Sequence, residues 1–257
     1  IIEKYESDNN PIIEKKLDLY EYQKNAIKKW EEEDCNGILS LATGTGKTII
    51  AIEIIKKFIQ KKQSCLIAVP WIDLQAQWLN EIEKWIPSKN SNYKVIKISS
   101  ASGQNELAVF QSISKRSLEK NGPYIFVITY RSLNNEINHN ILSKICDNLL
   151  FVADEVHRLS SSGSEKIIEG DTKLQFPYTL GLSATPERHY DPGEVASNRL
   201  KKFFVNGIIY EYSINDAIYK EPRALIPYEY IPQTIYLTQL EMKKYIKLSS
   251  EWAQKKG

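Results

Sequence analysis

The stretch GILSLATGTGKT, residues 37–48, decides the fold class of this chain. It joins residues 37–41, an apolar run typical of a buried strand, to a helical pattern in which Ile52, Ile55 and Ile59 share one face. Similar short apolar runs recur along the chain, separated in several places by amphipathic helical patterns, at residues 65–69, 93–98, 124–129, 149–153 and 178–182. This alternation predicts an α/β domain with a mostly parallel sheet and helices on both faces.

The loop between the first strand and its helix has the features of a phosphate-binding loop. Gly44 and Gly46 allow backbone N–H groups to approach phosphate oxygens, and the N-terminus of the following helix adds positive partial charge. Lys47 would reach the β- and γ-phosphates, and the Thr48 hydroxyl would ligate Mg²⁺. The strict pattern has Gly where this chain has Leu41, so a simple glycine-rich turn is the alternative. The expected nucleotide-binding residues of the loop are Thr43, Gly44, Thr45, Gly46, Lys47 and Thr48.

An acidic pair follows the apolar run at residues 149–153. Asp154 and Glu155 would lie at the carboxyl end of a parallel strand, where open α/β sheets bind ligands. Beside a phosphate-binding loop, Asp154 is suited to hold the Mg²⁺ that Thr48 ligates, and Glu155 to take a proton from the attacking water. Taken alone, the pair could equally be a surface acidic pair that opens a loop. Combined with Lys47, it favours a nucleotide-hydrolysing site with Lys47 and Glu155 as the catalytic residues.

A third motif, SATP at residues 183–186, follows the last of these apolar runs. Its hydroxyls could bond to the acidic site, although Ser, Thr and Pro also favour ordinary turns. In this order, the GTGKT, DEVH and SATP motifs resemble the first RecA-like lobe of superfamily 2 helicases and translocases. The match is to the DExH branch, which holds XPB-type helicases and restriction-enzyme motor subunits. The resemblance implies a RecA-like P-loop fold, ATP and Mg²⁺ as cofactors, and a role for His157, Ser183 and Thr185 in coupling hydrolysis to movement.

The segment LYEYQ, residues 19–23, is similar to an LRxYQ element of that family whose Gln contacts the adenine. The resemblance assigns this contact to Gln23, with Tyr20 in place of the family's Arg. A solvated helix position is the alternative for Gln23.

Two further segments resemble family motifs that contact the nucleic-acid backbone. They begin at Val69 and at Thr129, and the resemblance implies phosphate contacts from Pro70, Thr129 and Arg131. An ordinary surface position is the alternative for Arg131. Trp78 lies on an apolar helical stripe, so we assign it to the core.

The resemblance divides the chain into residues 1–18, an N-terminal extension, residues 19–220, the ATPase lobe, and residues 221–257, an interlobe linker with the start of a following helix. Thr238 and Glu241 have capping-box spacing at the start of that helix. We expect an ATP-dependent nucleic-acid helicase or translocase lobe, with DNA favoured over RNA and a second RecA-like lobe of the same protein as partner. The alternative is a nucleotide-binding switch or scaffold module that recruits partners without turnover; the presence of both Lys47 and Glu155 argues against it.

Composition places few further limits on function. The chain has 257 residues, of which 42% are hydrophobic and 26% charged, enough apolar content for a folded core. The net charge of +2 neither predicts nor excludes a nucleic-acid partner. The three cysteines are far apart, which argues against a disulfide framework and a zinc site. The sequence lacks an apolar run of membrane-spanning length and a signal peptide, so we expect a cytoplasmic location without membrane partners.

Overall fold

The computed structural model describes residues 18–86, 93–100, 102–159, 174–185, 198, 200, 201, 203–229 and 231–254. The chain divides into two compact units, one up to Leu225 and one from Ile226 onward, and each is described by itself. Most of the expected N-terminal extension lies outside the described residues, as do residues 160–164 and most of residues 188–198.

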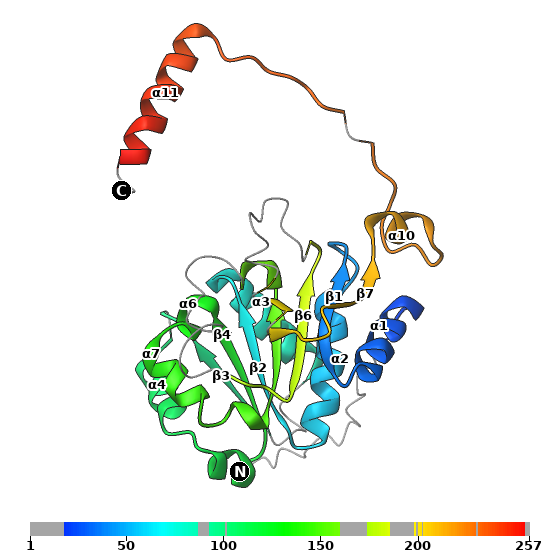
Figure 1. Cartoon of the computed structure of the whole chain (residues 1–257), viewed down its shortest axis with the longest axis vertical. Coiled ribbons are helices and arrows are strands. Elements are labelled where there is room, and N and C mark those ends of the chain that lie inside the picture. The colour runs from blue at the N-terminus through cyan, green and yellow to red at the C-terminus, as the bar shows by residue number, and fades with distance from the viewer. Residues whose placement is uncertain are drawn as a thin grey trace, which may run out of the picture. The chain divides into compact units, whose positions relative to one another are not determined.

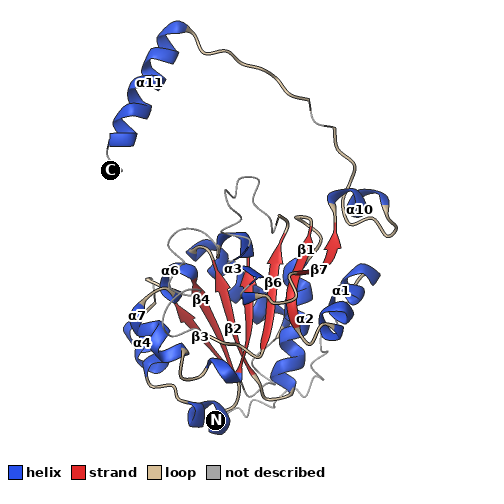
Figure 2. Ribbon diagram, viewed as in Figure 1, coloured by secondary structure: helices blue, strands red, loops and turns tan. Residues whose placement is uncertain are grey.

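The first unit is built on a seven-stranded sheet in which every described strand pair is parallel (Figures 1 and 2). The order across the sheet is β3-β4-β2-β5-β6-β1-β7. The strands are β1 (Asn36–Leu41), β2 (Ser64–Val69), β3 (Lys94–Ile98), β4 (Tyr124–Thr129), β5 (Leu149–Asp154), β6 (Tyr178–Ser183) and β7 (Ile208–Tyr212). The parallel α/β fold and the first six strands therefore confirm the prediction from the apolar runs.

Strand β7 is the described strand that the apolar runs did not predict. It pairs with β1 at one edge of the sheet, with a register shift between Ile38 and Leu39. Gly37 on β1 allows β7 to pack closely against it: its φ is +147°, and a Cβ there would lie 2.6 Å from Cγ2 of Ile209. A residue other than Gly at this position would force the β7 side chain to move.

Helices cover both faces of the sheet and form two hydrophobic cores. In the described part of the first unit, the α-helices with assigned bounds are α1 (Glu21–Glu32), α2 (Lys47–Gln60), α3 (Ile72–Trp85), α4 (Gln104–Gln111), α5 (Lys115–Lys120), α6 (Tyr130–Leu133), α7 (Glu136–Leu142) and α10 (Ile214–Tyr219). The first three helices contribute to one core, with Trp30, Ile55 and Trp78 among its buried residues. Helices α4 to α7 contribute to the other, with Phe110 and Leu133. The predicted apolar helix faces are confirmed, and Trp78 is fully buried as expected.

The second unit consists of an extended segment and helix α11 (Gln239–Gln254). The predicted capping box is present: the Glu241 carboxylate accepts from Thr238 N at 2.8 Å, and Thr238 Oγ1 accepts from Glu241 N at 3.3 Å. Large apolar side chains on α11, including Tyr245 and Ile246, are exposed. Among the described helices of both units, none combines the length and the apolar character that a membrane crossing requires.

Candidate nucleotide site and nucleic-acid edge

The motif residues gather along the edge of the sheet that is formed by the carboxyl ends of its strands. They do so because the strands before them are neighbours and run in the same direction. Strands β5, β6 and β1 lie side by side, with Asp154 in register with Leu182, and Ser40 with Ser183. The phosphate loop, the acidic pair and the SATP motif therefore leave the sheet next to one another. Strands β2 and β4 continue the same row, and their last residues, Val69 and Thr129, are in register.

The loop itself has the backbone that its glycines predict. Gly44 and Gly46 have φ values of +86° and +81°, a left-handed conformation in which Gly is strongly favoured. Lys47 is the first residue of α2, so it lies at the helix N-terminus. Leu41, which departs from the strict pattern, is a buried strand residue, and its backbone carbonyl accepts a 3.1 Å bond from Lys47 Nζ. Burial lowers the pKa of Lys47, and the charges of Glu155 and Asp154 oppose this shift.

Helix α1 braces the loop through two side chains. Tyr22 Oη donates to the Thr45 carbonyl at 2.7 Å, and Gln23 Nε2 donates to the same oxygen at 3.0 Å. Burial raises the pKa of Tyr22 to about 12, so its hydroxyl stays protonated and continues to donate near neutral pH. Gln23 is 5% exposed, and its Oε1 accepts from Tyr20 N at 3.0 Å. In this structure Gln23 is therefore a link between α1 and the loop rather than a solvated residue, and its predicted adenine contact stays a prediction.

The threonines of the loop have different surroundings. Thr43 is exposed and Thr48 half-buried, whereas Thr45 is buried and its hydroxyl donates to the Ala42 carbonyl at 2.7 Å. Because the Thr45 hydroxyl is engaged within the loop, a nucleotide would contact this residue through the backbone. The predicted ligand roles of Thr43 and Thr48 remain predictions.

Asp154 ends strand β5 and is 6% exposed. Its Oδ2 accepts from Trp78 Nε1 at 2.8 Å, and its Oδ1 accepts from Glu155 N at 2.9 Å. Burial raises the pKa of Asp154, and the bond from Trp78 opposes that shift. A third bond holds the main chain, where Tyr130 Oη donates to the Asp154 carbonyl at 2.6 Å. Sequence reasoning assigned Trp78 to the core and did not foresee its bond; the signal was that a buried indole N–H needs an acceptor.

Glu155 has an unusual backbone: φ is 49° and ψ is 52°, in the left-handed region that costs an ordinary residue about 1–2 kcal/mol. A short 3₁₀ turn, Val156–Arg158, follows it. His157 Nδ1 lies 3.4 Å from Glu155 Oε2 and 3.0 Å from Ser183 Oγ. Thr185 N donates to the same Ser183 Oγ at 3.2 Å. The three predicted coupling residues are thus joined to Glu155 in one chain of contacts.

The predicted nucleic-acid residues lie further along the same edge. Pro70 is half-buried, just before α3, and Arg131 is exposed on α6. Thr129 is buried and caps α6, because its Oγ1 accepts from Ser132 N at 3.3 Å. The structure therefore gives Thr129 a capping role that the sequence analysis had not assigned, and leaves Arg131 open to solvent.

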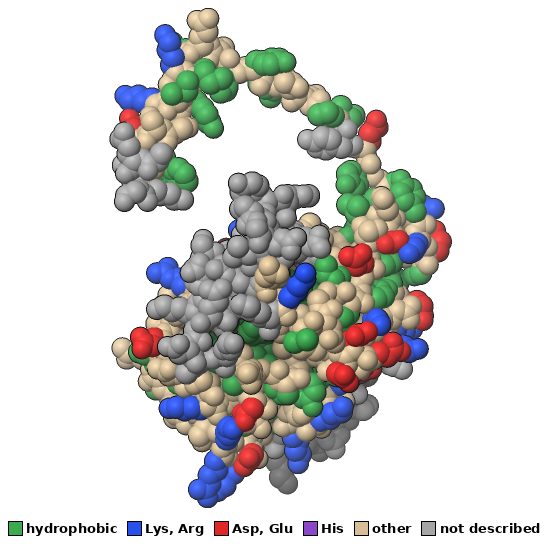
Figure 3. Space-filling view, viewed as in Figure 1, with side chains coloured by type: hydrophobic (Ala, Val, Ile, Leu, Met, Phe, Trp, Pro, Cys, Tyr) green, Lys and Arg blue, Asp and Glu red, His purple; other side chains and the backbone are tan. Residues whose placement is uncertain are grey.

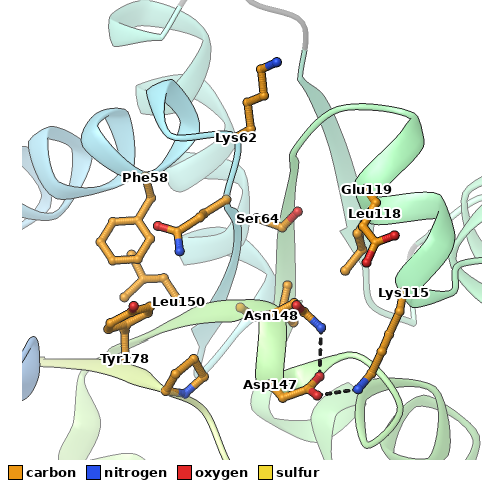
Figure 4. Close-up of a pocket in the computed structure, with 13 residues that line it drawn as sticks. Phe58, Lys62, Ser64, Lys115, Leu118, Glu119, Asp147, Asn148, Leu150 and Tyr178 are labelled. Carbon is orange, nitrogen blue, oxygen red and sulfur yellow. Dashed lines mark hydrogen bonds and ion pairs between the residues drawn. The ribbon is translucent and has the colours of Figure 1, made fainter.

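A partly open cavity of about 220 Å³ lies at the opposite edge of the sheet, where the strands begin (Figure 4). It is lined at the starts of three strands by Ser64, Leu149 and Tyr178, and by Lys115 and Asp147, which form an ion pair. None of the motif residues lines it, so this cavity is separate from the candidate site. On the face shown in Figure 3, described cationic and anionic side chains are interspersed rather than segregated.

Comparisons with known proteins identify a family and several relatives of this chain. A family model described as "Type III restriction enzyme, res subunit" matches residues 16–188. The "DNA 3'-5' translocase XPB2" of Sulfurisphaera tokodaii is 32% identical over 235 residues, which cover 91% of this chain and 44% of the relative. The "Putative ATP-dependent RNA helicase QP509L" of African swine fever virus is 27% identical over 186 residues, covering 68% of this chain and 31% of the relative. This chain therefore spans less than half the length of these curated relatives.

Solved structures share the fold. The helicase domain of Hef from Pyrococcus furiosus has a TM-score of 0.54 at 21% identity, over 74% of this chain and 38% of that one. The nuclease-deletion mutant of the Type ISP restriction-modification enzyme LlaGI, solved with a DNA substrate mimic, has a TM-score of 0.55 at 17% identity, over 78% of this chain and 20% of that one. The fold is that of a RecA-like helicase lobe of superfamily 2. The chain belongs to the family of Type III restriction enzyme res subunits.

Proposed function

We propose that this chain is the first motor lobe of an ATP-dependent nucleic-acid helicase or translocase, which couples Mg²⁺-dependent ATP hydrolysis to movement. The observation that carries the proposal is the row β4-β2-β5-β6-β1, because the phosphate loop, the acidic pair, the SATP motif and the segments expected to contact nucleic acid follow the carboxyl ends of these strands. The phosphate loop after β1 and the acidic pair after β5 are separated by a single strand. The nucleic-acid contacts expected after β2 and β4 adjoin them, so both functions share one rigid sheet.

The donor set fits Mg²⁺. Asp154 accepts one described hydrogen bond on each carboxylate oxygen, and an ionised carboxylate has about four lone-pair positions, so acceptor capacity remains. Thr48 would add a hydroxyl oxygen. Mg²⁺ is usually held by one or two protein oxygens together with phosphates and water, so this small set is sufficient. The metal would neutralise charge that develops on the transferred phosphoryl group.

Each motif side chain of the lobe would then have a separate role in ATP binding or hydrolysis. Lys47, at the N-terminus of α2, would hold the terminal phosphates by charge and by hydrogen bonds. Glu155 would accept the proton of the attacking water. His157 contacts both Glu155 and Ser183, so a movement of Glu155 during hydrolysis would shift the turn after β6. The adenine contact of Gln23 would require its amide to serve the ligand in addition to, or instead of, the loop carbonyl.

Nucleic acid would bind through backbone phosphates near Pro70, Thr129 and Arg131, without base specificity. We propose DNA as the track, which the name of the Sulfurisphaera relative supports, whereas the name of the viral relative points to RNA. A second RecA-like lobe, contributed by the same protein, would supply the arginine that phosphoryl transfer in related motors uses, an effect of roughly 10³–10⁵ in rate. Residues 221–257 would lead toward that lobe. We place the protein in the cytoplasm.

The test is a steady-state ATPase assay on the 257-residue chain and on the longer natural protein, each with and without DNA and RNA. We expect weak turnover by the chain and nucleic-acid-stimulated turnover by the longer protein. Lys47→Ala should abolish nucleotide binding in both while leaving the protein folded, as a cooperative thermal transition would show. Unchanged ATP affinity in a folded Lys47→Ala variant would reject the site. Nucleotide binding without any turnover by the longer protein would favour the switch module instead.

A further inference from the structure

Asp154 is held from both faces of the sheet. Trp78, in the core under α1 to α3, donates its indole N–H to the carboxylate, at 2.8 Å. Tyr130, in the core on the other face, donates its hydroxyl to the main-chain carbonyl, at 2.6 Å. All three residues are less than 7% exposed, so water competes little for these bonds. The position of Asp154 is therefore fixed by two helices on opposite sides.

Both helices begin at the predicted nucleic-acid contacts. Helix α3 starts two residues after Pro70, and Tyr130 lies between Thr129 and Arg131 at the start of α6. Helix α3 is also tied to the sheet by the Gln75 amide, whose Nε2 donates to the carbonyls of Ile98 and Val127 at 3.1 and 2.7 Å. A shift at the start of either helix would therefore be carried by a direct bond to Asp154.

We propose that Trp78 and Tyr130 are positioning residues that transmit nucleic-acid binding to Asp154 and hence to nucleotide and metal. The proposal rests on the function proposed above. Its physical basis is that the buried hydrogen bond from Trp78 to the carboxylate is strong and directional, while the bond from Tyr130 fixes the main chain that carries the carboxylate, so displacing either donor moves the carboxylate oxygens. The simpler explanation is that the two donors only satisfy buried polar groups of the core. The two explanations differ in whether nucleic acid and nucleotide remain energetically coupled when a donor is removed.

The experiment measures that coupling directly. The affinity of the 257-residue chain for Mg²⁺ with a non-hydrolysable ATP analogue is measured by calorimetry, with and without oligodeoxythymidine or oligouridine. The ratio of the two affinities is the coupling, which in allosteric proteins is typically about 5–150-fold. The variants are Trp78→Phe and Tyr130→Phe, each of which removes one donor and keeps an aromatic ring.

Matched controls separate positioning from loss of core packing. Trp30→Phe also truncates a buried indole whose N–H is bonded, in this case to the Thr179 carbonyl at 2.9 Å. Tyr93→Phe removes a buried hydroxyl that donates to the Ile86 carbonyl. Neither control residue has a bond to Asp154 or to the motif residues among the described contacts. Thermal unfolding of all four variants shows which remain folded.

We expect Trp78→Phe and Tyr130→Phe each to lower the coupling, by up to about tenfold for the loss of one such bond, while oligonucleotide affinity without nucleotide is retained. The controls should keep the wild-type ratio. A second readout needs no turnover: the chain has five tryptophans, so the indole N–H signal of Trp78 can be assigned by its loss in Trp78→Phe. In the wild type it should shift when oligonucleotide is added.

Three results would overturn the proposal: wild-type coupling in both variants, an equal loss in the controls, or a wild-type ratio of one with an unmoved Trp78 signal. In each of these cases, nucleotide binding that Lys47→Ala abolishes would leave the proposed function standing. If the wild-type chain and the longer protein both fail to bind nucleotide, the proposed function and this inference fail together.

Discussion

The side-chain amide of Gln23 occupies the space that a Cβ on Gly46 would need, since Nε2 lies 2.6 Å from that position. Gly46 also has a φ of +81°. Two separate constraints, backbone conformation and close approach, therefore require glycine at the N-terminus of α2.

The first prediction is that Gly46→Ala displaces Gln23, destabilises the lobe and weakens nucleotide binding. The matched control is Gly207→Ala, because Gly207 has a φ of +62° but no atom within 4 Å of a Cβ. Gly207→Ala should lower the free energy of unfolding only by the cost of a left-handed backbone at an ordinary residue, about 1–2 kcal/mol. Gly46→Ala should lower it by more. Denaturant unfolding and nucleotide calorimetry measure both effects. Equal costs for the two variants would mean that the Gln23 contact contributes nothing.

The second prediction concerns Glu155. In the longer protein, Glu155→Gln keeps the shape of the side chain but cannot accept a proton from water, so hydrolysis should slow by about 10²–10⁴ while ATP remains bound. Glu211→Gln, at an exposed position on β7, is the control and should leave turnover unchanged. Quenched-flow measurement of a single turnover separates hydrolysis from product release. Wild-type hydrolysis in Glu155→Gln would show that another group is the base.

The third prediction follows from the buried state of Lys47. Burial lowers its pKa below the ordinary value of 10.5, and bound phosphates would favour the charged form and raise it again. Nucleotide binding should therefore take up a proton, and affinity should fall as pH rises above the lowered pKa of the free protein. Calorimetry across alkaline pH, in buffers of different ionisation enthalpy, measures both. Lys47→Arg, which stays charged, should bind without this dependence; if its pH profile matches that of the wild type, another group is responsible.

The same shift has the opposite effect on folding. A lysine with a folded pKa below its unfolded value binds fewer protons when folded, so its burial destabilises the protein at low pH. That destabilisation is relieved as pH rises from the folded pKa to the unfolded one. Other groups also titrate in this range, so the contribution of Lys47 is the difference between the wild type and Lys47→Met in denaturant unfolding at each pH.

The fourth prediction concerns Arg131, which is exposed on α6 at the motif edge. Arg131→Ala should weaken binding equally for oligonucleotides of different sequence, and should reduce the slope of log affinity against log salt by about one. Arg116→Ala, on α5 beside residues that line the cavity at the opposite edge, should change neither. A loss restricted to one sequence would reject a phosphate contact.

Much of the fold could be predicted because its strands are buried on both faces. Runs such as residues 124–129 are apolar throughout, which makes them recognisable without alternation. Strand β7 was missed although its five-residue run is no more mixed than that of β3, the strand at the other edge of the sheet, which was predicted, so an edge position alone does not explain the omission.

The candidate site was predictable in its residues but not in its contacts. Gly46, Lys47 and Asp154 belong to local patterns that the sequence displays directly. The bond from Trp78 to Asp154 joins residues 76 positions apart, and no local pattern encodes such a pairing. The same holds for the bracing of Thr45 by α1, which gives Gln23 a structural link in addition to its predicted adenine contact.

The order of the strands has a consequence for how the protein is made. Strand β1 precedes the phosphate loop and is the first strand among the described residues, yet its two described neighbours are β6 and β7, which begin at Tyr178 and Ile208. During synthesis, β1 leaves the ribosome long before either neighbour exists, and its backbone groups stay without sheet partners until then. Such non-local pairing slows folding and leaves an apolar strand open to aggregation. Fragments of this protein that end before Tyr178 should therefore be insoluble, however complete their phosphate loop.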